Sequence, residues 1–467
     1  NSSDQPSYQK SDAVGECSLT PIQKWFLNNS NVHKNHFNQS VLLEAKSSID
    51  LSLLNQALQF VLEKHAALRS NFGLIGNQIK AIINEKAEAV AIKKVTVQNQ
   101  MELTNHLNQL QEGFDLVAQP LIRFSLIQFN AKELLFITAH HLVVDVISWR
   151  IILDDISSFY QLLKENKEIN TTKFYQQIPF KKWSEILKEY SVSESLLSEN
   201  KFWQKVEDKI QTAKIPNEKN YHSVAGFETI TKELNAELSS QLITTANKAY
   251  HTEINDLLLT ALFRVSQKCF SKNNIALDVE LHGRQGIDKD TPDLNQTVGW
   301  FTSMYPIYLE IADNAEIGYQ IKEVKEQIRA VPNKGLGYGV LKYLSEKIVG
   351  DHTPSIALNY LGQLDDGFDN DLFKLLPDTN TNNVSKHRYL DHAIELELFI
   401  QNQVLVIKTH FRTKNGLETW MNQFTETFKN ELTEIINHCT KKETTELTPN
   451  DLTFKGLSVE ELDNLFD

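Results

Sequence analysis

Two spacings of apolar residues alternate along the chain and predict its elements. In residues 54–62, apolar side chains recur three and four positions apart, as on one face of an α-helix. This helix is expected to continue through residues 63–72, with Arg69 near its end. Two apolar runs within residues 120–141 are separated by the polar residues 130–133, and such a pair of runs predicts a β-hairpin.

The same mixture of elements recurs further along the chain. An amphipathic helix is predicted over residues 149–163, followed by a Lys- and Glu-rich region of helices and connections over about 164–222. A strand at residues 228–234, a helix at 254–270 and a strand at 274–284 come next. Because each half mixes strands with helices, we expect two mixed α/β lobes with a site between them.

The stretch "ITAHHLVVDVISWRIILDD", in which His140 and His141 are followed by Asp145, carries the clearest chemical content. The histidines fall at the end of the second hairpin strand or in the loop before the next helix. Adjacent residues of an extended segment point to opposite faces, so one imidazole should pack and the other should face a cavity. Three roles remain open on the residues alone: a metal ligand, a hydrogen-bonded core residue and a proton carrier.

Composition narrows these roles. The 467 residues are enough for two domains, and a hydrophobic content of 41% indicates a globular protein. Cys17, Cys269 and Cys439 lack the paired spacing of a metal site or a disulfide framework, so metal is the weakest role and a reducing cytoplasm is expected.

The net charge of -13 argues against nucleic acid or an anionic membrane as the main partner, and no apolar run has membrane-spanning length. Residues 1–14 are expected to be a linker and, because the chain begins at Asn1, we expect a longer parent protein.

Two stretches of the second half combine strand patterns with reactive side chains. "DVELHGRQ" places Glu280 and Arg284 at the end of an apolar strand, where the pair could form a salt bridge or take part in acid/base chemistry. "TVGWFTSMYP", residues 297–306, predicts an aromatic-rich strand. This strand is either part of the core or a wall against which a ligand lies.

Two further stretches are candidates for ligand contacts. "NKGLGYGVL", residues 333–341, has three glycines but lacks the preceding strand of a dinucleotide-binding motif, so it gives little support to phosphate binding. "PSIALNYLGQL", residues 354–364, ends a strand on Asn359 and Tyr360. Both side chains can donate hydrogen bonds into a cleft.

These stretches, preceded by "LTPIQKWF" near the start, occur in the order found in one family. In them the chain resembles, over nearly its whole length, the epimerization domains of nonribosomal peptide synthetases, which are relatives of condensation domains. The resemblance implies an α/β fold with mixed sheets, two chloramphenicol-acetyltransferase-like lobes in a V and the active site in the tunnel between them. It divides the chain into a linker from an upstream carrier domain (1–14), an N-terminal lobe with the "HHLVVD" motif (15–215), a C-terminal lobe (216–445) and a docking tail (446–467).

The resemblance also carries site residues onto this sequence. It makes His141 and Glu280 the catalytic acid/base pair, and it makes Asp145 a structural aspartate expected to pair with Arg69. The other supporting positions are His140, Arg284, Asp155, Asn359 and Tyr360, and the expected substrate contacts are Trp300, Ser303 and Tyr338. Leu281, Gln285 and Gln296 depart from the family pattern, which alters the shape and charge expected of the cleft wall.

The activity implied by the resemblance is L-to-D inversion at the α-carbon of an aminoacyl or peptidyl group. That group is held as a thioester on the phosphopantetheine arm of a carrier protein. The thioester carbonyl acidifies the α-hydrogen, so one titratable group can remove the proton and another can return it to the opposite face. Asn359 and Tyr360 are candidates to donate hydrogen bonds to the enolate oxygen. The domain is expected to hold no cofactor and no metal, because the arm arrives on the partner.

The implied partners are an upstream peptidyl carrier domain and a downstream condensation domain. The acidic helix of the tail, with Glu460 and Glu461, would bind the latter, although it could instead be a terminal helix packed on its own domain. We expect a cytoplasmic monomer. The alternatives are a condensation domain that forms a peptide bond, an acyltransferase that uses soluble coenzyme A, and a catalytically silent docking module. The intact His141, Glu280 and Arg284 argue against the silent module.

Overall fold

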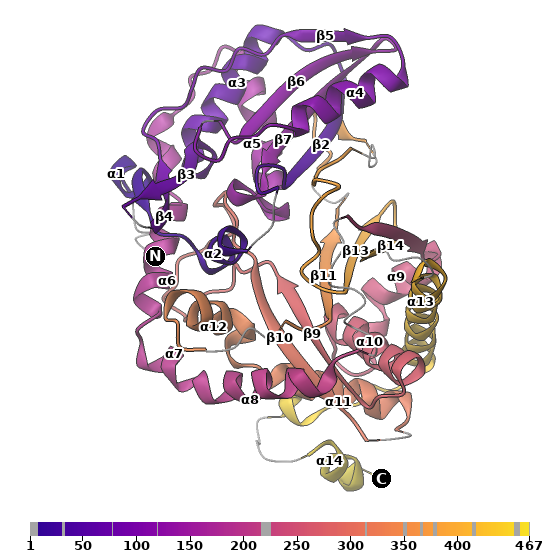
Figure 1. Ribbon diagram of the computed structural model, residues 1–467. Coiled ribbons are helices and arrows are strands. Elements are labelled where there is room, and N and C mark those ends of the chain that lie inside the picture. The colour runs from indigo at the N-terminus through magenta and orange to yellow at the C-terminus, as the bar shows by residue number, and fades with distance from the viewer. Residues whose placement is uncertain are drawn as a thin grey trace.

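The computed structural model describes most of the chain, which forms two lobes that lie one above the other in Figure 1. The described residues are 8–29, 33–76, 78–118, 120–215, 226–312, 315–348, 353–364, 368–376, 381–412, 417–452 and 458–466. Residues 1–7 of the predicted linker lie outside them. Residues 10–13 of that linker form the short helix α1 (Lys10–Ala13).

The predicted β-hairpin is confirmed and forms the centre of the N-terminal lobe. Its strands pair antiparallel, and both residues of the turn, Asn130 and Ala131, have positive φ, as a two-residue turn matched to the strand twist requires. The sheet has the order β12-β2-β7-β6-β5. The bounds of these strands are β2 (Asn38–Ala45), β5 (Lys94–Val97), β6 (Ile122–Phe129), β7 (Lys132–His140) and β12 (Phe373–Leu375).

Both faces of this sheet are covered by helices, because its strands carry apolar side chains on both sides. α3 (Leu51–Lys64) and α5 (Val146–Lys164) pack against each other, and their apolar residues belong to the main core. α4 (Gln100–Gln111) forms a small second core with strand residues such as Phe136. The helix predicted over residues 149–163 is present and begins three residues earlier, at Val146.

The expectation that one helix continues through residues 63–72 is wrong. α3 ends at Lys64, a 3-10 turn covers Ala66–Arg69, and β3 (Ser70–Ile75) begins directly after it. All residues of that turn are buried. A regular surface helix buries only one face, so it could not place four successive side chains inside. β3 pairs with β4 (Gln78–Ile83), which pairs with β1 (Gly15–Cys17) in a small separate sheet.

The C-terminal lobe has a mixed sheet of order β10-β9-β11-β13-β14-β8. The β9–β11 and β11–β13 pairs are parallel and the other pairs are antiparallel. The bounds are β8 (Glu228–Glu233), β9 (Asn274–Leu281), β10 (Ser303–Glu310), β11 (Ile356–Gln363), β13 (Ile394–Gln401) and β14 (Val404–Phe411). The mixed α/β architecture of both lobes agrees with the prediction.

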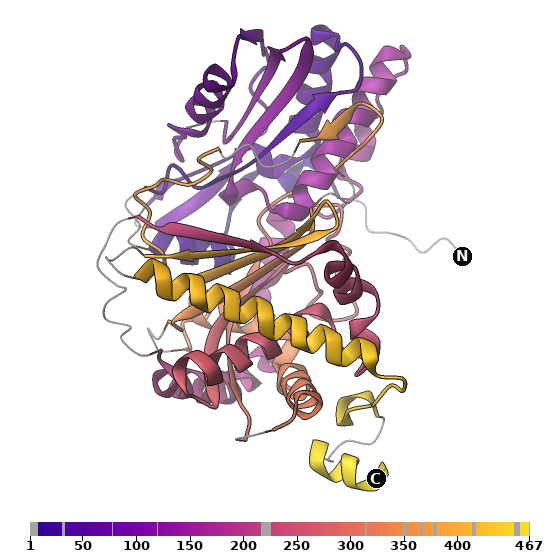
Figure 2. The same ribbon diagram turned by 90° about the vertical axis from the view of Figure 1, so that its right-hand side faces the viewer.

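Helices cover the face of the C-terminal sheet that points away from the other lobe. Figure 2 shows the long helix α13 running across this face. α10 packs against α13 and against α11, and it is buried over most of its length. The helices are α9 (Ala236–Thr244), α10 (Ile254–Phe270), α11 (Ile317–Arg329) and α13 (Leu417–Lys441). The predicted helix at 254–270 and strands at 228–234 and 274–284 are confirmed, the last ending at Leu281.

The chain crosses between the lobes, which corrects the predicted boundary at residue 215. Strand β12 comes from the C-terminal half but pairs with β2 in the N-terminal sheet, and Phe37 forms a bridge with Val384. In the other direction, α8 (Asn200–Ile210) packs against β10. Each lobe therefore contains a segment that the predicted division assigned to the other one.

The remaining helices join the lobes or follow them. They are α2 (Pro21–Asn28), α6 (Phe180–Tyr190), α7 (Glu194–Ser198), α12 (Leu336–Gly339) and, at the lower end of Figure 1, α14 (Val459–Phe466). α14 lies against α11, where Lys322 binds the carboxylate of Asp463 at 2.5 Å and Leu462 is buried. Among the described residues, no helix is both long enough and apolar enough to cross a bilayer.

Candidate active site

The two neighbouring histidines point to different surroundings, as predicted. β7 ends at His140, and a short 3-10 turn begins at His141. His140 is fully buried, with Nε2 placed 2.8 Å from the Lys34 carbonyl oxygen and Nδ1 accepting the N–H of Leu142. Burial lowers the pKa of His140 to about 3, so this imidazole stays neutral and structural.

His141 faces a cavity between the lobes and sits among aromatic rings. Its ring stacks on Phe37, with 5.4 Å between the ring centroids, and lies 4.4 Å from Trp300 on the other lobe. Its Nδ1 is 2.8 Å from the carbonyl oxygen of Val144, and its Nε2 is 2.9 Å from Nε2 of Gln39. Burial is the largest influence on the pKa of His141 and lowers it, so the imidazole is neutral near pH 7.

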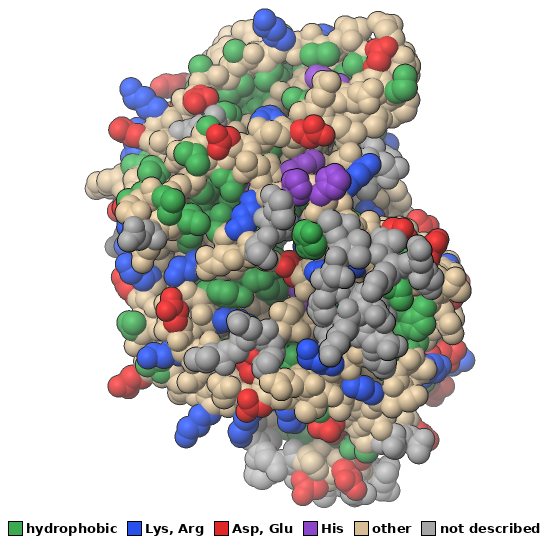
Figure 3. Space-filling view, in the orientation of Figure 1, with side chains coloured by type: hydrophobic (Ala, Val, Ile, Leu, Met, Phe, Trp, Pro, Cys, Tyr) green, Lys and Arg blue, Asp and Glu red, His purple; other side chains and the backbone are tan. Residues whose placement is uncertain are grey.

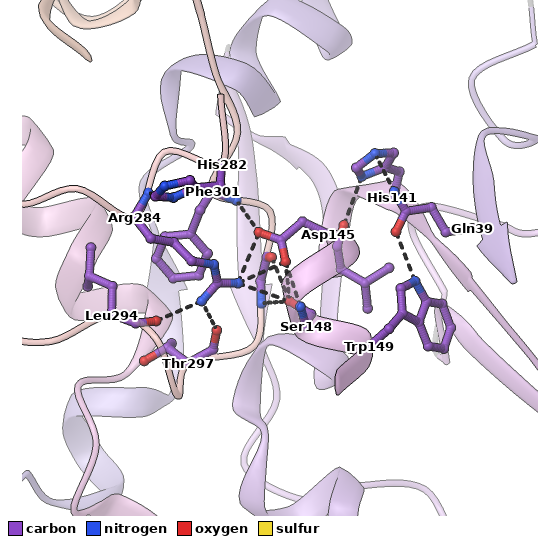
Figure 4. A network of polar contacts seen from close by, with 12 residues as sticks. Gln39, His141, Asp145, Ser148, Trp149, His282, Arg284, Leu294, Thr297 and Phe301 are labelled. Atoms are coloured by element: carbon purple, nitrogen blue, oxygen red, sulfur yellow. Dashed lines mark hydrogen bonds and ion pairs between the residues drawn. The ribbon is translucent and has the colours of Figure 1, made fainter. Parts of the chain in front are cut away.

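Asp145 joins the lobes, but not through the predicted partner. It caps the N-terminus of α5 and accepts two hydrogen bonds from a single guanidinium nitrogen of Arg284, at 2.8 and 2.9 Å (Figure 4). The expected pairing of Asp145 with Arg69 is wrong. The guanidinium of Arg69 instead donates to the backbone carbonyls of Leu62, Glu63 and Asn84.

The ion pair between Asp145 and Arg284 is buried on both sides. The same guanidinium donates to the carbonyl oxygens of Leu294 and Thr297, each at 2.7 Å, so Arg284 forms no salt bridge with Glu280. His141 and Glu280 each lie four residues before one member of the pair. The pair therefore fixes the two candidate groups relative to each other.

Glu280 lies on β9, directly opposite Asn359 on the parallel neighbour β11. Nδ2 of Asn359 donates to a carboxylate oxygen of Glu280 at 2.9 Å. Burial, with a further contribution from the charge of Glu395, raises the pKa of Glu280 to about 7. The amide of Asn359 is thus engaged in holding the Glu280 carboxyl group.

A row of charged side chains continues from Glu280 across the sheet. None of the sequence motifs described above includes its members Arg388, His392 and Glu395. His392 lies 2.7 Å from a carboxylate oxygen of Asp278, and its other ring nitrogen lies 3.5 Å from Glu395. Burial opposes protonation of His392, but these two carboxylates raise its pKa to about 10. Arg388 completes the group at 3.6 Å from Glu395. Acidic residues at alternate positions of "IELELF", an otherwise apolar strand, were the available signal.

A cavity of about 690 Å³ contains both candidate groups. Its walls come from both lobes, and the predicted site residues among them are His141, Asp145, Glu280, Trp300, Asn359 and Tyr360. On the side of the molecule seen in Figure 3, histidines gather where the lobes meet, and acidic and basic side chains are interspersed. The arrangement brings a neutral imidazole and a carboxyl group to one cavity.

Six predicted residues do not line this cavity: His140, Arg69, Arg284, Asp155, Tyr338 and Ser303. Asp155 binds Lys64 at 2.7 Å and His65 at 2.6 Å. The hydroxyl of Tyr338 donates to the buried Glu207. Ser303 lines a separate, much smaller cavity.

Metal binding finds no support in the side chains. No group of three or more His, Cys, Asp or Glu residues in the described part of the chain is arranged to hold a metal ion. The charged row near Glu280 pairs opposite charges instead.

Comparison with known proteins agrees with this architecture. A family model described as "Condensation domain" matches residues 13–457. "Surfactin synthase subunit 1" of Bacillus subtilis (strain 168) is 34% identical over 97% of this chain, which spans 13% of that protein. The crystal structure of the epimerization domain from the third module of tyrocidine synthetase B has a TM-score of 0.83 at 30% identity, covering 94% of this chain and 100% of that one. The condensation domain of a monacolin K polyketide synthase shares the fold, with a TM-score of 0.70 at 13% identity over 93% of this chain and 99% of its own.

Proposed function

The chain belongs to the condensation-domain family, and from that premise we propose that it inverts the α-carbon of a carrier-bound aminoacyl or peptidyl thioester during nonribosomal peptide synthesis. The observation that carries this proposal is the pairing of His141 with Glu280. They come from different lobes and line one cavity. Inversion needs two proton-carrying groups, one on each side of the substrate carbon, and does not need a nucleophile.

The resting protonation states divide the work between these groups. Burial lowers the pKa of His141 and raises that of Glu280 to about 7, so just below pH 7 the imidazole is neutral and the carboxyl group carries a proton. In this form His141 takes the α-proton, and the electron pair of the broken C–H bond moves to the thioester oxygen. Glu280 then returns its own proton to the opposite face of the carbon. The reverse direction starts from the exchanged states, carboxylate and imidazolium.

Tyr360 supports the enolate formed between the two steps. Tyr360 lies on β11, two strands from β10 in the sheet, and its side chain lines the cavity. Burial raises the pKa of Tyr360 to about 12, so the phenol keeps its proton and donates to the oxygen on which charge develops. Asn359, the other expected donor, is assigned instead to orienting Glu280, because its amide is hydrogen-bonded to that carboxyl group.

The domain works with partners that supply and remove the thioester. An upstream peptidyl carrier domain delivers it on a phosphopantetheine arm, and the domain acts as a cytoplasmic monomer that holds no cofactor of its own. A downstream condensation domain docks on the exposed face of α14, which carries Glu460 and Glu461. Replacing both with Lys is expected to weaken transfer to the downstream subunit and to leave inversion intact. Unchanged transfer would place docking elsewhere.

The proposal is tested with an aminoacyl thioester loaded on a carrier protein in deuterated water. The wild-type chain is expected to incorporate deuterium at the α-carbon and to give a D/L mixture. His141→Ala and Glu280→Gln are each expected to lose at least about a thousandfold in rate, because each removes one of the two proton carriers. Glu63→Gln, an exposed carboxylate on α3, is the matched control and should behave as wild type.

The outcomes separate the possible reactions. Deuterium uptake that survives in both variants would contradict the two-group mechanism. Amide formation without α-exchange, after a second loaded carrier is added, would identify a condensation domain instead. Neither reaction would indicate a silent docking module.

A further inference from the structure

Gln39 occupies the place beside His141 on the neighbouring strand. β2 pairs antiparallel with β7, so that Asn38 lies opposite His140 and Gln39 opposite Ala139. The Gln39 side chain lines the same cavity as His141. No motif in the sequence marks this glutamine as functional.

The direction of the Gln39 amide is fixed by its other neighbour. The indole N–H of Trp149 donates to Oε1 of Gln39 at 2.9 Å, and an indole N–H can only donate. The NH₂ group of Gln39 therefore faces Nε2 of His141, 2.9 Å away. Figure 4 shows Gln39 between His141 and Trp149.

The same reasoning sets the proton on the imidazole. The carbonyl oxygen of Val144 can only accept, so Nδ1 of His141 carries the proton and donates it across 2.8 Å. Nε2 then bears the lone pair and accepts from Gln39. Three hydrogen bonds, from Trp149 to Gln39 to His141 to Val144, thus run in one direction.

We propose that Gln39 is a positioning residue for the epimerization described above: it holds His141 as the Nδ1–H tautomer and covers the Nε2 lone pair until a thioester enters the cavity. This inference rests on the proposed function. It concerns the state of the base before the reaction, whereas the proposed function concerns the reaction itself.

The geometry opposes protonation of the resting base. An imidazolium donates from both nitrogens, so its Nε2–H would meet the NH₂ group of Gln39, donor against donor. Turning the amide would bring NH₂ against the indole N–H of Trp149, which creates the same conflict one step away. A carbon-bound α-hydrogen cannot compete with an amide for the lone pair, so the amide must move aside when the substrate approaches.

Titratable and charged groups around His141 also influence its protonation. They are Asp145 at the start of α5, Arg388 before β13, His140 next to it in the chain, and Glu280 and His282 across the cavity. Asp145 favours the imidazolium and Arg388 disfavours it. Because these groups stay in place when only Gln39 is changed, a shift caused by the substitution reports on the amide.

The experiment uses the whole chain without substrate and follows the His141 imidazole by nitrogen NMR, assigned by its loss in His141→Asn. The wild type is expected to show the Nδ1–H tautomer and to stay neutral down to a pH below 6.5. Gln39→Glu places an acceptor against Nε2 and should raise the pKa of His141 by about one unit or more. Gln39→Met removes the donor and should raise it less, as should Trp149→Phe, which frees the amide to turn.

Gln128→Glu is the matched control, since it makes the same charge change on β6 outside the cavity lining. It should leave the His141 titration unchanged. An Nε2–H tautomer in the wild type, or an unshifted titration in both Gln39 variants that fold, would overturn the proposal.

Exchange kinetics then link Gln39 to the reaction. In Gln39→Glu the acid limb of the pH profile for deuterium uptake should move upward with the His141 titration. An acid limb that stays in place while the titration moves would overturn the role of Gln39 in epimerization. Expected NMR shifts together with no deuterium uptake by the wild type would overturn the proposed function and leave the hydrogen-bond assignment standing.

Discussion

The surroundings of His141 and of Glu280 differ in kind, although burial drives both groups toward their neutral forms. Around His141 the neighbours are uncharged: the rings of Phe37 and Trp300 and the amide of Gln39. We call these residues with His141 the imidazole half. Around Glu280 the neighbours are charged: Glu395, His392 and Arg388. We call these with Glu280 and Asn359 the carboxyl half.

This difference shows two ways to favour the neutral form of a titratable group. In the imidazole half, desolvation is the largest influence and the charges of Asp145 and Arg388 act in opposite directions, so shape and hydrogen-bond direction control the base. In the carboxyl half, desolvation is adjusted by a set of opposing charges, so the pKa depends on the sum of several ionised groups. Substitutions in the charged row should therefore act mainly on Glu280, and substitutions of the rings against His141 should act mainly on that imidazole.

The largest effect is expected from separating the two halves. Arg284→Met leaves the Asp145 carboxylate buried without its cation, which should lower the free energy of unfolding by about 3–5 kcal/mol. Deuterium exchange should also be lost, because each half is anchored four residues from this pair. Chemical denaturation measures the first effect, and the carrier-bound thioester assay measures the second.

Lys10→Met is the control for that substitution, since Lys10 forms an exposed pair with Glu85 and its removal should leave stability unchanged. A double variant, Arg284→Met with Asp145→Leu, removes both charges and should recover part of the lost stability. If the Arg284→Met protein is as stable as the wild type, the buried pair does not hold the lobes together.

The next effect concerns the pH profile of the carboxyl half. Glu395→Gln removes a negative charge that raises the pKa of Glu280, while the cations of His392 and Arg388 remain. The pKa of Glu280 should fall, so Glu280 loses its proton at lower pH. The alkaline limb of the exchange rate, expected at about pH 7 in the wild type, should move down by about one half to one unit.

Glu397→Gln gives a graded control for this shift. The charge of Glu397 also raises the pKa of Glu280 but ranks below the other neighbours, so the limb should move in the same direction by less. An alkaline limb that does not move in Glu395→Gln would mean that the charged row has no control over Glu280. The imidazole half and the carboxyl half would then not differ in how the pKa of each group is controlled.

A smaller effect is expected from a change of shape in the imidazole half. Trp300→Phe keeps an aromatic face against His141 and removes an indole N–H that has no hydrogen-bond partner among the described residues. The exchange rate should fall by about threefold or less. Trp300→Leu removes the face and admits water, so the pKa of His141 should rise toward its usual value of about 6.5. Equal effects of the two substitutions would contradict control by shape.

The hairpin and the helix on either side of His141 could be predicted from sequence because they are contiguous in the chain. The hairpin, the opposite directions of His140 and His141, and the helix after them all follow from periods of two and of about 3.6 residues. The partner of Asp145 could not be found in this way. Arg284 lies 139 residues further along, and only the packing of the lobes selects it over Arg69.

Most residues of the carboxyl half could not be predicted from sequence, for a related reason. Glu280 was found by resemblance, but His392, Glu395 and Arg388 meet it through pairing between strands that are distant in sequence. The crossing of β12 into the other lobe was hidden too, because a three-residue strand leaves no periodic signal. Gln39 carries an ordinary polar side chain, and its importance comes only from the Trp149 and His141 atoms on either side of it.

The smallest effect on catalysis is expected at Asp155, which the resemblance placed among the residues associated with activity. It lies on α5, as Trp149 does, but binds Lys64 and His65 outside the cavity. Asp155→Asn should therefore reduce stability by about 1–3 kcal/mol through the weakened contacts to these two side chains.

The exchange rate per folded molecule should stay within about twofold of the wild type in Asp155→Asn, because a loss of stability changes the folded fraction and not the geometry of the cavity. Asp154→Asn, one position earlier on the same helix and more exposed, is the matched control and should change neither quantity. Rates are normalised to the folded fraction from denaturation curves. A loss well beyond twofold would show that α5 transmits changes at its middle to His141, and the boundary drawn here around the imidazole half would have to include Asp155.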